Sequence, residues 1–368
     1  MARIGFDAKR AFHNGTGLGN YSRDLLRIVS KYYLDNTYYL YNPRKAKETR
    51  YQLAKNNREI LPKSKFWKKL SSLWRQCAVV NQLLEDKIEI YHGLSGELPR
   101  GINKTGIKTI VTIHDLIFIR YPKLYSFFDR KIHFSKFKHA TKIADVVIAI
   151  SEQTKRDIVT FLKINPKKIK VVYQGCSNAF KKDFSLDLIE KVKKKFNLPT
   201  HFVLNVGTIE ERKNLLNLVK AIRNIDTILV VVGGDKSDYA KKIKQYIVAN
   251  KMNNKVFFLK NVALEELAII YKLADVFVYP SLFEGFGIPI IEALYSKTAV
   301  ITSKEGCFSE AGGENSIYVN PNDVLEIKKS IKLVLENSVQ RKKMEEKGWF
   351  YAQQFNDDII VKNIYNLY

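Results

Sequence analysis

Short apolar runs alternate along the chain with longer amphipathic stretches, a pattern typical of parallel sheets whose strands are joined by crossover helices. The runs are rich in Val and Ile without polar alternation, as expected for strands that are buried on both faces. The pattern predicts strands at residues 4–6, 108–113, 146–150 and 169–173, and again at 202–206, 227–232, 256–259 and 276–279. Two α/β sheets are therefore expected, one in each half of the chain.

A polar, lysine-rich stretch separates the two halves. We predict domains at residues 1–176 and 201–348, joined by a linker at 177–200. The total of 368 residues suits this division, because it is about twice the usual length of one domain. The tail at 349–368 is predicted to form one helix that crosses back to the first domain, with Trp349, Phe350 and Phe355 as its apolar anchors.

Composition narrows the class of protein. With 46% hydrophobic and 12% aromatic residues, the chain is too apolar for a disordered protein. No charged segment leads into an apolar signal region at the start, and no run approaches the ~18 apolar residues of a membrane span. Cys77, Cys176 and Cys307 are scattered and lack the spacing of a disulfide framework or a metal site. A reducing, cytoplasmic location is expected.

The formal net charge of +25 attracts phosphates, whether in nucleotides, nucleic acids or anionic lipids. The abundance of lysine also allows a plain solvated surface. Residues 63–75 place five apolar side chains at helical spacing between lysines, which is the composition of an interfacial helix on anionic lipid. Phe66 and Trp67 are the expected lipid contacts, and packing of Leu73 and Trp74 on the first sheet is the alternative. A peripheral position on the inner face of the cell membrane would follow from lipid contact.

The strongest motif runs from Glu284 to Glu292 and directly follows the strand predicted at 276–279. Its Gly-Phe-Gly-Ile-Pro core indicates a loop that enters a helix, since Pro289 suits the first helical turn. A helix N-terminus at the carboxyl end of a parallel strand is a common phosphate site. Glu292 would lie roughly 6 Å further along the helix axis. The two carboxylates are suited to sugar or ribose hydroxyls; the alternative is an ordinary helix start with solvated glutamates.

A second motif spans residues 205–214, where a strand, a glycine turn at Gly207 and two adjacent cations precede a predicted helix. Arg212 offers a planar fork of donors and Lys213 a compact charge, so the two together could chelate a diphosphate. The alternative is a surface charge pair.

The two motifs together resemble the retaining, GT-B "group 1" family of nucleotide-sugar glycosyltransferases. Glu284 and Glu292 match its E-x7-E motif with the G-F-G-x-P core intact, and residues 207–214 match its G-T-x-E-x-R-K-N phosphate loop. In the first half, residues 16–21 resemble its glycine loop and His114-Asp115 its H-D segment. The resemblance implies an α/β protein with the GT-B fold, whose two Rossmann-like domains have parallel sheets facing across an interdomain cleft.

The resemblance also implies a role for each matched position. Glu292 would hold the donor ribose, and Arg212 with Lys213 would hold the diphosphate. The sugar hydroxyls would meet Glu284 and the backbone of the three residues that follow Gly285, while His114 would touch the sugar from the opposite domain. Gly17 would let the donor phosphate or the acceptor approach the backbone. The implied catalytic set is Glu284, His114, Arg212 and Lys213, and the implied donor-binding set is Glu292, Arg212, Lys213, Phe286, Gly287, Ile288 and Gly17.

The function predicted from this resemblance is retaining transfer of a hexose, mannose first and then glucose or galactose. The donor would be a GDP- or UDP-linked sugar, and the acceptor a lipid-linked or growing surface glycan. No D-x-D triplet occurs, so a metal-independent site without a further cofactor is expected. No nucleic-acid motif is found, and no nucleic-acid partner is expected. The alternatives are a nucleotide-sugar epimerase of the same fold and a non-enzymatic polyanion-binding protein driven by the net charge.

Overall fold

The computed structural model describes residues 1–48, 50–234 and 236–368, and it divides into two compact units. Unit 1 comprises Met1–Gln174 together with Asn356–Tyr368, and unit 2 comprises Gly175–Phe355. The stretch at 177–200 that the sequence suggested as a linker therefore lies within unit 2. It contains a 3₁₀ turn and a helix of eleven residues.

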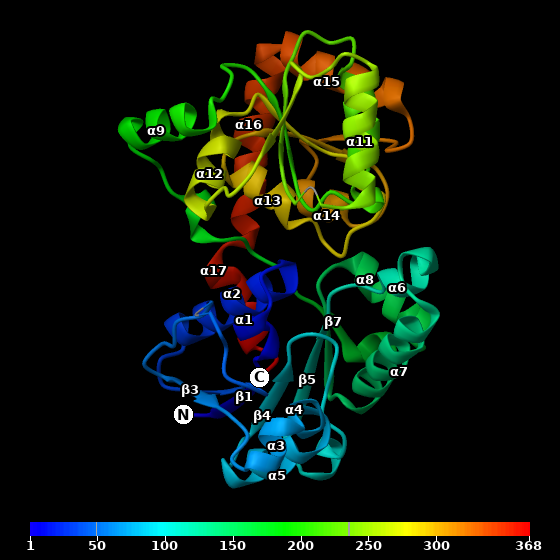
Figure 1. Cartoon of the computed structure of the whole chain (residues 1–368). Helices are drawn as coiled ribbons and strands as arrows, with labels where there is room; N and C mark the ends of the chain where they lie inside the picture. The colour runs from blue at the N-terminus through cyan, green and yellow to red at the C-terminus, as the bar shows by residue number, and fades with distance from the viewer. Residues whose placement is uncertain (49, 235) are drawn as a thin grey trace. The chain divides into compact units, whose positions relative to one another are not determined.

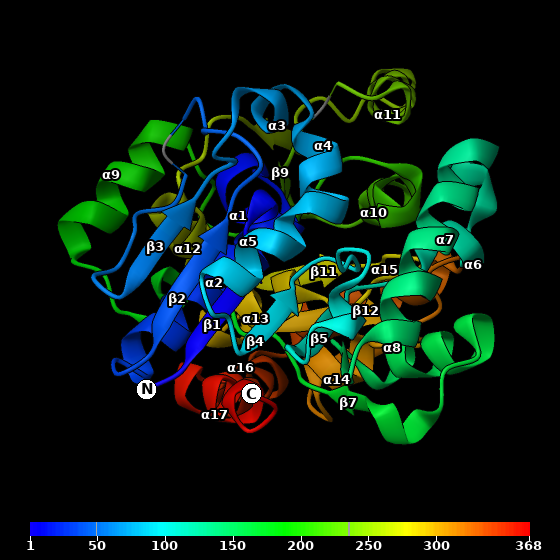
Figure 2. The ribbon, with the colours of Figure 1, turned by 90° about the horizontal axis from the view of Figure 1, so that it is seen from below.

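Unit 1 is built on a parallel sheet with the order β3-β2-β1-β4-β5-β6-β7, in which β3, β2, β1 and β4 lie side by side in Figure 2. The strands are β1 Arg3–Asp7, β2 Thr37–Tyr41, β3 Asn57–Ile60, β4 Ile90–Gly93, β5 Lys108–Ile113, β6 Val146–Ala149 and β7 Ile169–Val171. The α-helices are α1 Lys9–His13, α2 Gly17–Tyr32, α3 Lys65–Lys69, α4 Ser71–Leu73, α5 Val79–Glu85, α6 Ile117–Arg120, α7 Phe127–Ile143, α8 Glu152–Asp157 and α17 Asp357–Tyr365. Shorter turns are the π-helical η1 Trp74–Ala78 and η4 Ile158–Leu162, and the 3₁₀ turns η2 Ile102–Lys104, η3 Pro122–Leu124 and η5 Pro166–Lys168.

Side chains of this sheet alternate between two hydrophobic cores, because successive residues of a strand point to opposite faces. Phe6 and Leu40 share one core with α1, α2 and α17. Tyr41 and Val111 share the other with α5, η1 and α7. Figure 1 shows α17, at the red end of the chain, beside α2. Both faces of the sheet are thus covered by helices, as a parallel sheet requires.

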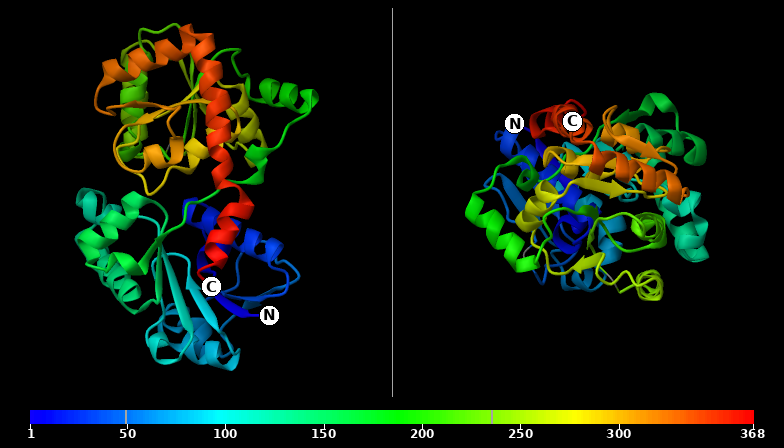
Figure 3. Two further views of the ribbon diagram at one scale, coloured as in Figure 1. Left: turned by 180° about the vertical axis from the view of Figure 1, so that it is seen from behind. Right: turned by 90° about the horizontal axis from the view of Figure 1, so that it is seen from above.

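Unit 2 repeats the plan with the order β10-β9-β8-β11-β12-β13, again entirely parallel. Its strands are β8 Val203–Val206, β9 Leu229–Val232, β10 Val256–Leu259, β11 Val276–Tyr279, β12 Ala299–Ser303 and β13 Ile317–Val319. Its helices are α9 Leu186–Phe196, α10 Leu215–Ile222, α11 Asp238–Ala249, α12 Leu264–Leu273, α13 Ile288–Tyr295, α14 Phe308–Gly312, α15 Val324–Glu336 and α16 Ser338–Ala352, with 3₁₀ turns η6 Asn178–Lys181, η7 Glu211–Lys213 and η8 Gln353–Phe355. Helices α10, α11 and α15 share the core on one face. Helices α13 and α16 pack on β12, and Figure 3 (left) shows α16 as a long helix along the sheet.

The end of the chain differs from the single helix predicted at 349–368. Residues 349–352 finish α16, and a separate helix, α17, starts at Asp357. Asn356 adopts an extended backbone, and Asp357 and Asp358 place negative charge in the first turn of α17, both of which favour a new helix start. Of the predicted anchors, Phe355 is fully buried as expected and Trp349 is partly buried, but Phe350 is 68% exposed, so its assignment as an anchor was wrong.

Candidate active site

The two sequence motifs follow neighbouring strands at the centre of the unit 2 sheet. Strands β8 and β11 pair directly, and the chain proceeds from β8 to β9 on one side and from β11 to β12 on the other. Such a reversal of strand order is the point where open α/β sheets bind ligands, beyond the carboxyl ends of the strands. Gly207 follows β8 with φ +147°, a conformation in which a side chain would be strained. The loop after β11 carries Glu284.

The cations of the first motif converge on the glutamate of the second. Lys213 Nζ lies 2.6 Å from one carboxylate oxygen of Glu284, and Arg212 Nη1 lies 2.9 Å from the other. The loops are also joined through their backbones, since the Leu282 N–H donates to the Arg212 carbonyl at 2.8 Å. The side chains of Arg212, Lys213 and Glu284 are only 13%, 15% and 11% exposed. They form a packed ionic cluster rather than a surface charge pair.

This cluster keeps Glu284 ionised. Burial by itself raises the pKa of the carboxyl, but the charges of Lys213 and Arg212 outweigh it and lower the pKa to about 2. Tyr279, the last residue of β11, adds a further bond: its hydroxyl donates to Glu284 Oε1 at 3.0 Å and accepts from Lys213 Nζ at 2.5 Å. At the rim, Glu210 accepts from Arg212. The result is a pair of cations held in fixed positions at the strand ends, an arrangement suited to an anion.

Glu292 lies in a different environment, on α13. The helix begins after Gly287, whose φ is +113°, with Pro289 in its first turn. Glu292 makes no ion pair with any residue that the structure describes, and its Oε2 accepts a hydrogen bond from the Tyr271 hydroxyl at 3.2 Å. Burial raises the pKa of its carboxyl to about 7, although the Tyr271 hydroxyl acts in the opposite direction. The two glutamates of one motif thus differ in charge state near neutral pH, as groups with separate tasks commonly do.

Three residues that support this site were not found by sequence reasoning. Tyr279 and Tyr271 contact the two glutamates through their hydroxyls. Cys307 donates from its buried thiol to the carbonyls of Glu284 and Phe286, at 3.2 and 3.1 Å, and so fixes the loop before α13. Tyr279 could have been suspected because it ends the strand before the motif. Cys307 is distant in sequence from the loop and gives no local signal.

The other residues expected to contact the sugar from unit 2 lie at the start of α13. The Phe286 side chain is buried, and its ring packs against Phe355 with centroids 5.6 Å apart. Phe286 can therefore offer only its backbone to a ligand, and the resemblance assigns the backbone of Phe286, Gly287 and Ile288 to the sugar hydroxyls.

His114 follows β5 in unit 1 and is held as a neutral ring. Its Nε2 lies 2.9 Å from the Leu94 carbonyl, which can only accept, so Nε2 carries the proton. Its Nδ1 then accepts from the Gln174 amide at 3.1 Å. Burial lowers the pKa of His114 to about 4, and the Tyr21 ring packs edge-on against it with centroids 4.5 Å apart. Both nitrogens are thus engaged, which suits a positioning contact better than proton transfer.

Gly17 begins α2 in unit 1, at the glycine loop after β1. A Cβ added at Gly17 would meet no atom within 4 Å, whereas one at Gly19 would lie 1.9 Å from the Asn14 carbonyl oxygen. Gly19 is therefore needed by the fold itself. The space above Gly17 is open, and a glycine there leaves room for a ligand to reach the backbone.

We therefore expect Gly17→Ala to fold normally and to lower kcat/KM by about tenfold or more, because a methyl group displaces a substrate from its reacting position. Gly19→Ala should instead lower the melting temperature. Thermal melts and steady-state kinetics on both variants separate the two effects. Normal kinetics in Gly17→Ala would show that no substrate approaches this glycine.

The stretch expected to touch lipid, residues 63–75, divides in the structure. Trp74 is buried in the core that also contains residues of α5, as the alternative interpretation required, but Leu73, which the same interpretation packed on the first sheet, is 50% exposed. Trp67 is partly buried against the same core, while Phe66 is 61% exposed. Lipid contact through Phe66 and Trp67 stays a prediction, and lipid contact through Trp74 is excluded by its burial. Among the described residues, no helix combines the length and the apolar character needed to cross a membrane.

Comparison with known proteins agrees with this arrangement. A family model described as "Glycosyl transferases group 1" matches residues 188–349, and one described as "Glycosyltransferase Family 4" matches residues 17–179. The O-antigen chain mannosyltransferase RfbU of Salmonella typhimurium is 33% identical over 220 residues, which cover 58% of this chain and 57% of the relative. The match thus spans little more than half the length of that relative.

Solved structures share the fold over the whole chain. Sucrose-phosphate synthase from Thermosynechococcus elongatus superposes with a TM-score of 0.80 at 21% identity, covering 100% of this chain and 98% of that one. Alr3699/HepE of Anabaena, solved in complex with UDP and glucose, gives a TM-score of 0.75 at 18% identity, covering 100% and 98%. At these identities the likeness concerns the fold alone.

Proposed function

Because the chain belongs to the group 1 glycosyltransferases with the GT-B fold, we propose that it transfers a hexose from a nucleotide-diphosphate sugar to a lipid-linked or growing surface glycan of the lipopolysaccharide type. Mannose is the favoured sugar, ahead of glucose and galactose, and GDP or UDP is the nucleotide. The name of the Salmonella relative supports mannose and a surface glycan. The observation that carries the proposal is the convergence of Arg212 and Lys213 on Glu284, at the strand reversal of unit 2.

The proposed reaction uses these charges directly. Cleavage of the bond to the anomeric carbon leaves negative charge on the β-phosphate, and Arg212, Lys213 and the N-terminal N–H groups of α13 stabilise it. When the diphosphate takes over part of the coordination of the two cations, lone pairs of the Glu284 carboxylate become available for sugar hydroxyls. Glu292 accepts from the ribose hydroxyls, and His114 contacts the sugar.

Retention of the anomeric configuration is part of the proposal. In the front-face route, the departing phosphate accepts the proton of the attacking acceptor hydroxyl, so no separate general base is needed. His114 is neutral and both of its ring nitrogens already form hydrogen bonds within the protein, so it is not needed as a base on this route. Glu284, whose charge is held by two cations, is better suited to binding hydroxyls than to attacking the anomeric carbon.

The proposal is tested by incubating the protein with GDP-mannose, UDP-glucose or UDP-galactose and a lipid-diphosphate acceptor. Mass spectrometry should show an acceptor heavier by one hexose with one donor, and NMR should show a retained anomeric configuration. Donor conversion without any acceptor would indicate the epimerase. An equal rise in melting temperature with every polyanion, without turnover of any donor, would indicate a polyanion-binding protein.

Transfer is expected to persist in excess chelator, because the leaving group is stabilised by fixed cations and the sequence has no D-x-D triplet. Initial rates with and without EDTA, after dialysis against the chelator, provide the measurement. Loss of activity that returns with added Mn²⁺ or Mg²⁺ would contradict metal independence.

A further inference from the structure

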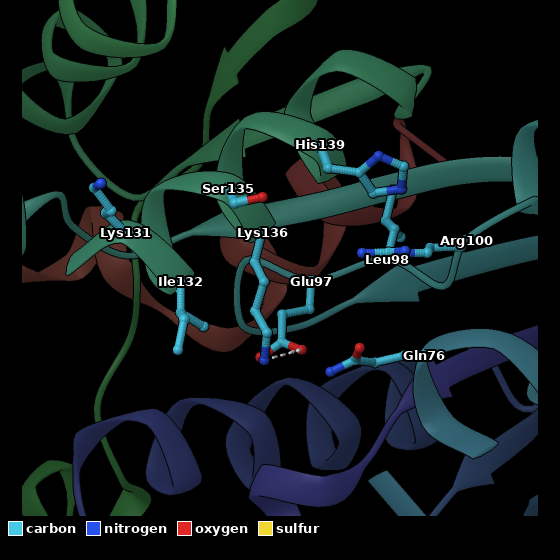
Figure 4. Close-up of a pocket in the computed structure, with 9 residues that line it drawn as sticks. All are labelled: Gln76, Glu97, Leu98, Arg100, Lys131, Ile132, Ser135, Lys136 and His139. Carbon is cyan, nitrogen blue, oxygen red and sulfur yellow. Dashed lines mark hydrogen bonds and ion pairs between the residues drawn. The ribbon is translucent and has the colours of Figure 1, made fainter. Parts of the chain in front are cut away.

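A pocket of about 350 Å³ lies within unit 1, outside the residues assigned to the donor. Its walls come from α7, the loop after β4 and the π-helical turn η1. The lining residues, labelled in Figure 4, are Gln76, Glu97, Leu98, Arg100, Lys131, Ile132, Ser135, Lys136 and His139. The volume is within the range of small-ligand sites, about 300 to 1,000 Å³.

The pocket carries an excess of positive charge. Its carboxylate, Glu97, is neutralised from within the protein, by Arg75 at 2.8 Å and by Lys136 at 3.4 Å, the pair drawn with a dashed line in Figure 4. Arg100 and Lys131 are exposed and form no ion pair with any residue in the described part of the chain. In addition, His139 Nε2 is buried there without a hydrogen-bond partner. Among the described residues, the Lys131 ammonium group contacts only an aromatic face, that of the Phe127 ring, 4.5 Å from its centroid, so that two cations and an imidazole remain to meet an anion.

An apolar stripe continues from the pocket along α7. Ile132, Ser135, Lys136 and His139 line the pocket, and Phe128 precedes Ile132 by four residues, so it lies on the same helix face one turn away. Phe128 is 75% exposed and Ile132 52% exposed. Phe128 and Ile132 together extend the pocket with an exposed apolar surface, which an apolar partner could cover.

We propose that the pocket and this stripe bind one amphiphilic ligand, the lipid-linked phosphate or diphosphate of the acceptor. Arg100 and Lys131 hold its phosphate oxygens, and Ile132 and Phe128 cover the first carbons of its hydrocarbon chain. A soluble phosphate would leave the stripe unused, and an uncharged hydrocarbon would leave the cations unused. This assignment rests on the proposed function and specifies that the acceptor is lipid-linked.

Direct binding tests the assignment without turnover. Calorimetry with farnesyl diphosphate, inorganic diphosphate and farnesol is performed with saturating nucleoside diphosphate, so that the donor site is occupied. Farnesyl diphosphate should bind most tightly. Arg100→Gln and Lys131→Gln should each weaken it by about tenfold, the usual effect of losing one charged hydrogen bond. Phe128→Ser should weaken the binding of farnesyl diphosphate but not that of inorganic diphosphate. Lys170→Gln, at an exposed lysine on β7, serves as the matched charge control.

Three outcomes would overturn the assignment. Farnesyl diphosphate binding that is unchanged in the Arg100, Lys131 and Phe128 variants would exclude the pocket. Binding that is lost in Lys213→Ala but kept in those variants would place the anion in the donor site. Variants that lose adhesion to phosphatidylglycerol vesicles but keep farnesyl diphosphate binding would identify a membrane contact instead of a ligand site.

Kinetics separates this assignment from the proposed function. In a wild-type protein that transfers sugar, Arg100→Gln should raise KM for the lipid-diphosphate acceptor about tenfold and leave KM for the donor unchanged. If the wild type transfers sugar and the variant keeps its acceptor KM, the pocket assignment fails alone. If the wild type transfers no sugar from any donor but pocket variants still lose farnesyl diphosphate binding, the proposed function fails and the binding site stands.

Discussion

Lys213→Ala is expected to lower kcat/KM by roughly 10²-fold, an effect comparable to the loss of one oxyanion-hole donor. The ammonium group of Lys213 lies beside Glu284 at the end of β8, where the leaving diphosphate would develop charge. Steady-state kinetics with the cognate donor provides the measurement. The loss should appear in kcat as well as in kcat/KM, since the charge increases toward the transition state.

The fold should survive this substitution, because Glu284 keeps its contacts with Arg212 and the Tyr279 hydroxyl. Circular dichroism and thermal melts check this point. Lys220→Ala, at an exposed lysine on α10, is the matched control and should have normal kinetics. Near-normal activity in folded Lys213→Ala would exclude the leaving-group role.

Glu292→Gln and Glu284→Gln are expected to separate binding from turnover. Glu292→Gln exchanges an acceptor oxygen for a donor, so nucleoside diphosphate binding should weaken by about 1.5 to 3 kcal/mol, the usual contribution of charged hydrogen bonds. Glu284→Gln should not weaken nucleoside diphosphate binding but should reduce turnover, because its proposed partner is the sugar, which the free nucleotide lacks. Calorimetry and kinetics on both variants measure the difference.

Two results would contradict the roles assigned to these glutamates. If Glu284→Gln loses nucleotide affinity and Glu292→Gln keeps it, the two roles are reversed. If neither variant changes binding or turnover while both remain folded, the motif is structural. Because Glu284 anchors Arg212 and Lys213, its variant also requires a thermal melt before its kinetics are compared.

Nucleoside diphosphate affinity should rise between about pH 6 and 8. The pKa of Glu292 is raised to about 7, so the carboxyl is largely protonated at pH 6 and largely ionised at pH 8. The ionised form accepts two ribose hydroxyl bonds, so binding favours it and is linked to proton release. The nucleotide phosphate also titrates near this range. Because Glu292→Gln lacks the titrating carboxyl, the pH dependence of its nucleotide affinity measures the contribution of the phosphate alone. An identical pH dependence in wild type and Glu292→Gln would contradict the role of Glu292.

The sequence by itself determined the elements whose signals are local. Short runs rich in β-branched and aromatic residues predicted β5, β10 and β11 with their observed bounds, and the glycines and Pro289 predicted the loops after β8 and β11. The local signal was weaker elsewhere. Strand β2 is rich in tyrosine and was not predicted. The start of α17 depends on the sequence Asn-Asp-Asp, which the prediction of one continuous helix passed over. The E-x7-E spacing likewise identified Glu284 and Glu292 without indicating their different environments.

Only the tertiary structure decided which of these residues meet. Lys213 and Glu284 are 71 residues apart in sequence, and they touch because β8 and β11 are neighbours in the sheet. That contact, and the burial of Glu292 beside Tyr271, set the opposite pKa shifts of the two glutamates. Burial likewise distinguished Trp74, packed in a core, from Phe66, exposed to solvent. Spacing along the chain fixes which face of an element a side chain occupies, whereas charge state and desolvation depend on what the fold packs against that face.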